Sequence, residues 1–153
     1  PAVVRTGAGD DLVQQDLAVE DGLATDGGAG TDVLAIRGVD GLEGAQRPAL
    51  TLDLRDGTTA LDRGDAVDVA SGTVHGYEEH RFIGDLTWTF YGTEGADRVW
   101  AMTDGPLQAW TFGGDDFIGG TEHGDHLDAG DGTDEVHGGG GSDTCLAYEA
   151  GEC

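Results

Sequence analysis

Aspartates recur every nine residues through the last third of the chain, and this period limits what the chain can fold into. The aspartates are Asp116, Asp125, Asp134 and Asp143, and glycines cluster before each of them. Two positions after each aspartate stands a residue that we expect to point into the core: Ile118, Leu127, Val136 and Cys145. A unit with one short strand and one glycine turn cannot bury an apolar side chain alone, so units must stack. Side chains alternate between the two faces of a strand, which places each of these residues on the face that points into the core. The period therefore predicts an all-β stack of parallel strands.

The spacing of the aspartates also predicts which turns face each other. Two units make a coil of 18 residues, and four aspartate pairs match it, the third with one inserted residue and the fourth with three: Asp116 and Asp134, Asp125 and Asp143, Asp97 and Asp116, and Asp11 and Asp32. Aspartate supplies the hard anionic oxygen that calcium prefers, and turn carbonyls can complete six or more oxygen ligands. Glycine allows positive φ angles, which bring those carbonyls close to an ion. Leu107 follows Pro106 where the period expects an aspartate, so we predict no ion there.

Two segments match a longer motif in full. Residues 27–34 and 138–145 both read G-G-x-G-x-D-x-U, where U is an inward residue. They resemble the RTX, or hemolysin-type, calcium-binding nonapeptide repeats. Residues 76–84, G-Y-E-E-H-R-F-I-G, resemble the G-F-E-x-x-x-G spacer between blocks of these repeats. The resemblance implies a right-handed parallel β-roll that binds calcium between facing turns.

The resemblance also implies a set of ligands for about three or four calcium ions. In the family, one turn gives its second and fourth carbonyls and its sixth-position aspartate, and the facing turn gives its first and third carbonyls and its own aspartate. Carried over, the sets are Phe112, Gly114 and Asp116 against Ala129, Asp131 and Asp134; Thr121, His123 and Asp125 against Gly138, Gly140 and Asp143; Thr93, Gly95 and Asp97 against Thr111, Gly113 and Asp116; and Gly7, Gly9 and Asp11 against Gly27, Ala29 and Asp32.

The repeats divide a single module into three blocks. We expect a first repeat block over residues 1–38, ion-poor coils and the spacer over 39–91, and the main repeat block over 92–153. Within the middle block, residues 51–59 alternate as a strand and then reach a turn at Asp56 and Gly57. We expect longer, looser coils here that continue the stack. A separate small domain is the alternative, although about thirty residues could hardly bury a core.

The charge of the chain excludes some partners and indicates a setting. The formal net charge is −24, with 31 acidic and seven basic residues, so nucleic acid and anionic membranes are poor partners. No apolar stretch approaches the ~20 residues of a membrane span. Because weak calcium sites need roughly millimolar calcium, we expect a secreted or cell-surface module. We also expect it to be part of a longer parent protein with neighbouring domains. The alternative is that the acidic residues form only a solvated or disordered surface.

The two cysteines, Cys145 and Cys153, lie at the end of the chain. A disulfide between them would close a short loop, stabilise the fold by roughly 2.5 kcal/mol, and cap the last coil. Such a bridge fits an oxidising compartment. The alternative is two free thiols, which alkylation without a reductant would reveal.

Two further functions were weighed against calcium binding. Tyr91, Trp88, Trp100 and Trp110 could form an aromatic platform for a carbohydrate or cell surface, or could simply fill a wider core. Enzyme chemistry has weaker support, because the serines lack a nucleophile motif and paired carboxylates such as Glu78 and Glu79 arise by chance in so acidic a chain. His123, His126 and His137 lack a fourth zinc ligand at a sensible spacing. We therefore predict a non-catalytic protein.

Overall fold

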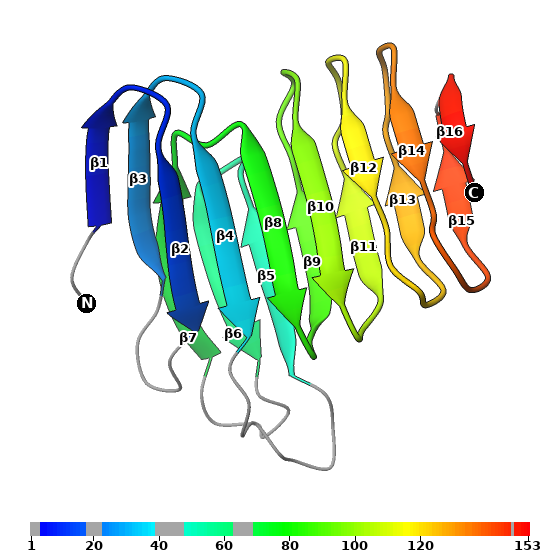
Figure 1. Ribbon diagram of the computed structural model, residues 1–153, viewed down its shortest axis with the longest axis horizontal. Helices are drawn as coiled ribbons and strands as arrows, with labels where there is room; N and C mark the ends of the chain where they lie inside the picture. Colours follow the sequence, from blue (N-terminus) through cyan, green and yellow to red (C-terminus); the bar gives the residue numbers. More distant parts are fainter. Residues whose placement is uncertain (1–3, 18–22, 39–47, 63–68, 148) are drawn as a thin grey trace.

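A computed structural model describes residues 4–17, 23–38, 48–62, 69–147 and 149–153, and this part consists of β-strands without a helix (Figure 1). Two sheets face each other. In spatial order, the nine-stranded sheet contains β1 (Val4–Ala8), β3 (Ala24–Ala29), β7 (Val69–His75), β6 (Thr58–Asp62), β5 (Ala49–Asp53), β9 (Thr87–Tyr91), β11 (Leu107–Trp110), β13 (His126–Asp128) and β15 (Thr144–Leu146). The seven-stranded sheet contains β16 (Ala150–Glu152), β14 (Glu135–His137), β12 (Phe117–Gly119), β10 (Arg98–Thr103), β8 (Glu79–Gly84), β4 (Val33–Gly38) and β2 (Leu12–Leu17).

The chain alternates between the sheets from β8 to β16, and each strand pairs in parallel with the strand one coil away. The period-nine residues point inward as predicted: Ile118, Leu127 and Val136 are fully buried. Cys145 is partly buried against the same core. The predicted parallel β-roll is confirmed. Within the described segments, no helix is long and apolar enough to cross a membrane.

Aromatic side chains meet in the core between the sheets in the middle of the roll. Phe82 of β8 stacks on Trp88 of β9 with ring centroids 4.5 Å apart. His80 is fully buried beside Phe90, and neither ring nitrogen has a hydrogen-bond partner. Burial lowers the pKa of His80 to about 3, so its imidazole stays neutral. Trp88 is also completely buried and therefore cannot serve in an exposed aromatic platform.

The middle block does not simply continue the coils, and here the prediction is wrong. Strand β6 pairs antiparallel with both β5 and β7, while β5 rejoins the parallel stack beside β9. Gly57 has a φ of 69° in the turn after β5, and this turn sends the chain straight back along the same sheet. As a result β5 and β6 lie between β7 and β9, whereas β4 and β8 are direct neighbours in the other sheet. Residues 39–47 and 63–68 lie outside the described part.

The disulfide prediction is confirmed. Cys145 and Cys153 are bonded, with Cα atoms 5.9 Å apart. The bond links β15 of one sheet to the residue that follows β16 of the other. It therefore holds the last coil closed at the end of the stack (Figure 1).

Candidate metal centre

One edge of the roll carries one carboxylate per coil, where the chain crosses from the nine-stranded to the seven-stranded sheet. The strand register places these acids in line: Asp11, Asp32, Glu78, Asp97, Asp116, Asp134 and Glu149. We call this set the acid column. Its members are spaced by the distance between parallel strands, about 4.8 Å, so each carboxylate has another on either side except at the ends.

Backbone amides orient the acid column. In five of the seven acids, one carboxylate oxygen accepts a hydrogen bond from the N–H of the acid one coil earlier: Asp32, Glu78, Asp116, Asp134 and Glu149. Asp97 N–H donates to Asp116 Oδ1 at 2.8 Å, and Asp116 N–H donates to Asp134 Oδ1 at 2.9 Å. Asp11 N–H donates to Asp32 Oδ1 at 2.8 Å. These charge-assisted bonds hold one oxygen of each of these five carboxylates and leave the other for a different partner.

Two members of the acid column were not predicted as site residues. Asp32 N–H donates to Glu78 Oε2 at 2.7 Å, and Asp134 N–H donates to Glu149 Oε2 at 2.9 Å. Both glutamates thus take the place of the sixth-position aspartate. A signal was present for Glu78, because it stands two residues before the buried His80, as each aspartate stands before an inward residue. Because residues 76–84 resemble the spacer motif, Glu78 was not assigned to a repeat turn from the sequence.

Three carboxylate oxygens of the acid column are buried without a hydrogen-bond partner: Oδ2 of Asp32, Asp116 and Asp134. The three residues are 0%, 4% and 1% exposed. Leaving a charged oxygen buried and unpaired is costly, and native structures usually give such a group a donor or an ion. Calcium takes carboxylate oxygens of this kind. The residues present therefore fit a hard cation at these turns.

Burial also makes the carboxylates harder to ionise. It raises the pKa of Asp97 to about 6. It raises the pKa of Asp116 as well, and the neighbouring charge of Asp134 adds to the effect. A bound divalent cation would favour the ionised form and offset both penalties.

The turns that precede the aspartates on both edges of the roll are of two kinds. In the first kind, the second residue has a positive φ, as at Gly28 (96°), Gly130 (85°) and Gly139 (92°). Phe112 takes the same position with a φ of 72°, a conformation that is strained for a residue with a side chain. The strain at Phe112 shows that the turn geometry is imposed by the stack and not by local preference.

The second kind of turn has a threonine at the second position and closes on its own aspartate. Thr121 N–H donates to Asp125 Oδ2 at 2.6 Å, and the Thr121 hydroxyl lies 2.9 Å from Asp125 Oδ1. Thr93 N–H donates to Asp97 Oδ2 at 2.6 Å, and the Thr93 hydroxyl lies 3.1 Å from the same oxygen. Asp97 and Asp125 therefore already have donors at the oxygen that is unpaired in Asp32, Asp116 and Asp134.

Glycine at the first turn position makes room for the carboxylate. A Cβ added at Gly138 would lie 2.6 Å from Asp143 Oδ2, and one at Gly120 would lie 2.5 Å from Asp125 Oδ2. These distances are too short for any side chain. Glycine is thus required at these two positions because the aspartate folds back over its own turn.

The structure brings every predicted ligand set together on adjacent turns. In the Asp116 and Asp134 set, Asp131 N–H donates to Phe112 O at 2.7 Å and Gly114 N–H donates to Asp131 O at 3.0 Å. In the first block, Gly9 N–H donates to Ala29 O at 2.8 Å. Several predicted carbonyl ligands thus also join one turn to the next. Their role in binding calcium stays a prediction.

Side chains alone do not form a metal cluster. Over the described ranges, no group of three or more His, Cys, Asp or Glu side chains is placed to hold a metal ion. The acid column brings carboxylates together in pairs, so a calcium site here would need backbone carbonyls for its remaining ligands.

Among the residues that the structure describes, the opposite edge of the roll carries fewer acids in line. Asp125 N–H donates to Asp143 Oδ1 at 3.0 Å, and Leu107 N–H donates to Asp125 Oδ1 at 2.7 Å. Leu107 thus takes the aligned position, but its side chain is fully buried in the core. His123 is exposed in the turn before Asp125.

The exposed aromatic residues do not form the single platform that was considered. Trp100 of β10 and Trp110 of β11 point outward from opposite sheets, because their neighbours Val99 and Ala109 point into the core. Trp110 stacks on Tyr91 on the nine-stranded sheet, with centroids 5.1 Å apart. The two tryptophans therefore lie on opposite faces of the roll.

Comparisons with known proteins add no further assignment to this site. A search of protein-family models finds none that matches the chain, and a search of curated proteins finds no match either.

Proposed function

We propose that this chain is a non-catalytic calcium-binding β-roll module of a secreted or surface protein, and that calcium bound between facing turns folds and stabilises it. The observation that carries the proposal is the set of buried, unpartnered carboxylate oxygens at Asp32, Asp116 and Asp134. The resemblance of the repeat to RTX proteins supports the same ion. Neighbouring domains of a longer parent protein are the proposed structural partners.

The turns differ in how well they suit an ion. We propose that the Asp116 and Asp134 pair binds calcium most tightly, because an oxygen of each is buried without a donor. Asp11 and Asp32 form the next best pair. Asp97 and Asp125 have less need of a cation, since Thr93 and Thr121 already donate hydrogen bonds to their carboxylates. About three or four ions in total remain our expectation.

Calcium binding and folding should form one process. At a net charge of −24 the chain repels itself, and its many glycines are entropically costly to order. Bound divalent cations would offset the repulsion, and the site hardly exists before the coils stack. The module would therefore stay loose at low calcium and fold where calcium is abundant.

A calcium titration of the chelated protein by calorimetry, with circular dichroism on the same sample, tests the proposal. We expect uptake of about three or four ions with a gain of strand signal. No uptake at millimolar calcium, or an unchanged strand spectrum, would overturn it.

Asp134→Ala gives a sharper test with Asp104→Ala as its matched control. Asp134 belongs to the acid column and has a buried unpartnered oxygen, whereas Asp104 lies exposed and off the nine-residue period. We expect Asp134→Ala to raise the calcium concentration at the folding midpoint about tenfold, a loss of about 1.4 kcal/mol. Asp104→Ala should leave the midpoint nearly unchanged. Equal midpoints for the two variants would contradict the site assignment.

A further inference from the structure

The outer face of the seven-stranded sheet carries a trough along β10. Two hollows form it. One, of about 430 Å³, is lined by Glu79, Arg81, Arg98, Trp100 and Met102. The other, of about 460 Å³, begins at Met102 and continues past Asp104 and Glu122. Because Met102 lines both hollows, they meet at this side chain, and we call the whole the β10 trough.

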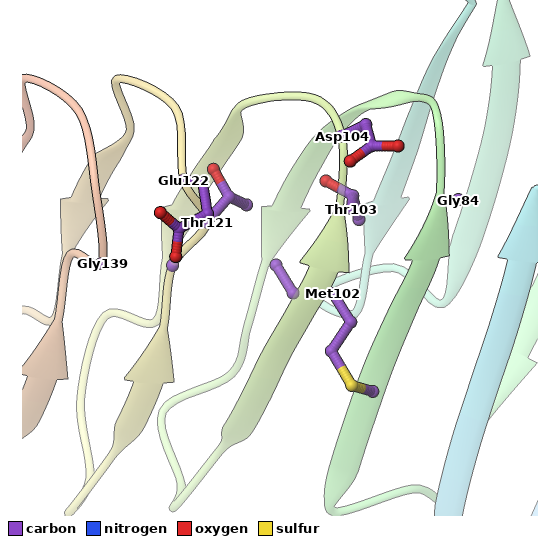
Figure 2. Close-up of a pocket in the computed structure, with 9 residues that line it drawn as sticks. Gly84, Met102, Thr103, Asp104, Thr121, Glu122 and Gly139 are labelled. Atoms are coloured by element: carbon purple, nitrogen blue, oxygen red, sulfur yellow. The ribbon is translucent and has the colours of Figure 1, made fainter.

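The second hollow exists because glycines, which have no side chain, line part of it. Gly84, Gly120 and Gly139 line it from neighbouring coils, so little projects from the sheet around Met102. Figure 2 shows the side chains of Asp104 and Glu122 on neighbouring coils, with Met102 extending from β10. The trough is therefore open, with Met102 between its two hollows and carboxylates at this end.

Trp100 gives the trough a flat aromatic surface. It is 40% exposed, although large aromatic side chains are usually buried in a roll this small. A Cβ added at Gly119 would lie 3.1 Å from a carbon of the Trp100 six-membered ring, so the indole covers this glycine. Phe117 packs against the indole with ring centroids 4.3 Å apart and the ring planes tilted by 32°. One face of the indole thus rests on the sheet while the remainder is open to solvent.

The charged groups along the trough do not add up to a positive patch, because Glu79, Asp104 and Glu122 offset Arg81 and Arg98. Arg81 Nε lies 2.6 Å from Glu79 Oε1, and Arg98 places its guanidinium 5.8 Å from the centre of the Phe117 ring. The other end holds the carboxylates of Asp104 and Glu122. The trough therefore offers donors at one end and acceptors at the other, but no excess of positive charge to attract an anion.

We infer that the β10 trough binds an uncharged oligosaccharide, with one sugar ring stacked on Trp100. The apolar face of a sugar ring matches an exposed indole, and sugar hydroxyls can both accept from guanidinium groups and donate to carboxylates. An extended open trough suits a chain of sugars better than a compact ligand, which would need an enclosed pocket. A net charge of −24 disfavours acidic polysaccharides and nucleic acid. The inference rests on Trp100, which belongs to none of the predicted calcium sites; Thr121, of the predicted Asp125 set, lines only the second hollow.

Calorimetric titrations with short uncharged oligosaccharides test the inference, using β-1,4-glucan, β-1,3-glucan, α-1,4-glucan and β-1,4-linked N-acetylglucosamine as probes in saturating calcium. We expect saturable binding of at least one probe, weakened about tenfold or more in Trp100→Ala. Trp110→Ala is the matched control, because Trp110 lies on the opposite face, and it should bind as the unaltered protein does. Trp100→Phe keeps an aromatic ring and should retain part of the affinity.

Each remaining outcome overturns the inference. These outcomes are no saturable binding of any probe at millimolar concentration, binding that survives Trp100→Ala, and binding restricted to a sulfated oligosaccharide such as a heparin fragment. Far-ultraviolet circular dichroism in calcium, recorded for each variant, shows whether the roll is intact. A failure of sugar binding in a roll that folds with calcium concerns the trough alone, whereas failure of calcium-dependent folding concerns the proposed function.

Discussion

A threonine at the second turn position changes what the aspartate of the same turn needs. At Asp125 the Thr121 N–H and hydroxyl reach the carboxylate, and the hydroxyl also accepts a hydrogen bond from His123 N–H at 3.0 Å. At Asp134 the equivalent position is Gly130, which has no side chain, and one carboxylate oxygen stays buried and unpaired. The threonine hydroxyl thus does part of what an ion would do, and the two kinds of turn should respond differently to mutation.

Thr121→Val tests this difference at the residue scale. Valine keeps the shape but removes the hydroxyl, which leaves the His123 N–H and the buried Asp125 carboxylate each short of a partner. We expect the free energy of unfolding in saturating calcium to fall by about 1–3 kcal/mol. Thr133→Val is the control, since Thr133 is exposed in its turn, and should change stability by less than about 0.5 kcal/mol. Denaturant unfolding measures both, and equal losses would show that the Thr121 hydroxyl has no special role.

The last coil forms one open end of the roll. All of β16 is exposed, and its neighbour β14 is the only strand it pairs with. β15 likewise lies at the edge of its sheet and exposes Leu146. An open edge of this kind frays easily and offers unpaired backbone groups to other chains. The disulfide closes the coil, and Glu149 attaches it to the acid column through Asp134 N–H.

The double change Cys145→Ser and Cys153→Ser tests this element. We expect it to lower the free energy of unfolding by roughly 2.5 kcal/mol, since the bridge restricts the unfolded chain. Hydrogen exchange should become faster in β15 and β16 but stay slow in β8 and β10, which lie inside the stack. A reductant should have no further effect on the variant. Uniformly faster exchange across all strands would show that the bridge supports the whole roll and not just its end.

At the scale of the whole molecule, the fold brings acidic residues together against the repulsion between their charges. The parallel stack aligns acids that the sequence keeps many residues apart, and it places them one strand spacing from each other. Burial then raises the pKa of Asp97, Asp116 and Asp125, because each carboxylate loses contact with water, and the charge of a neighbouring aspartate adds to the effect. A general screening of charge by salt acts on the exposed acids but reaches the buried ones poorly. We therefore expect calcium to act by coordination.

A comparison of salts tests this expectation. Sodium chloride at the ionic strength of millimolar calcium should leave the chelated protein without the gain in strand signal that calcium produces. Magnesium should be much weaker than calcium, because it requires near-ideal octahedral geometry and keeps its water. Circular dichroism with each salt measures the effect. Equal folding in sodium chloride would mean that screening of the net charge, and not a built site, drives the transition.

The sequence by itself determined the parallel roll, because a period of nine residues with glycine turns has one way to bury its inward side chains. It also determined the inward positions of Ile118, Leu127 and Val136 and the pairing of Cys145 with Cys153, which depend on local spacing. The alignment of Asp116 with Asp134 followed from the same count.

Only the tertiary structure decided the remaining features, because each depends on contacts between distant segments. The antiparallel course of β6 depends on which strand is free to pair when the chain turns back at Gly57. Glu78 joins the acid column through the register of β4 against β8, which the irregular spacing of the middle block concealed. The opposite directions of Trp100 and Trp110 depend on which sheet each strand enters. Spacing along the chain sets the turns, but the stacking of coils decides what each turn faces.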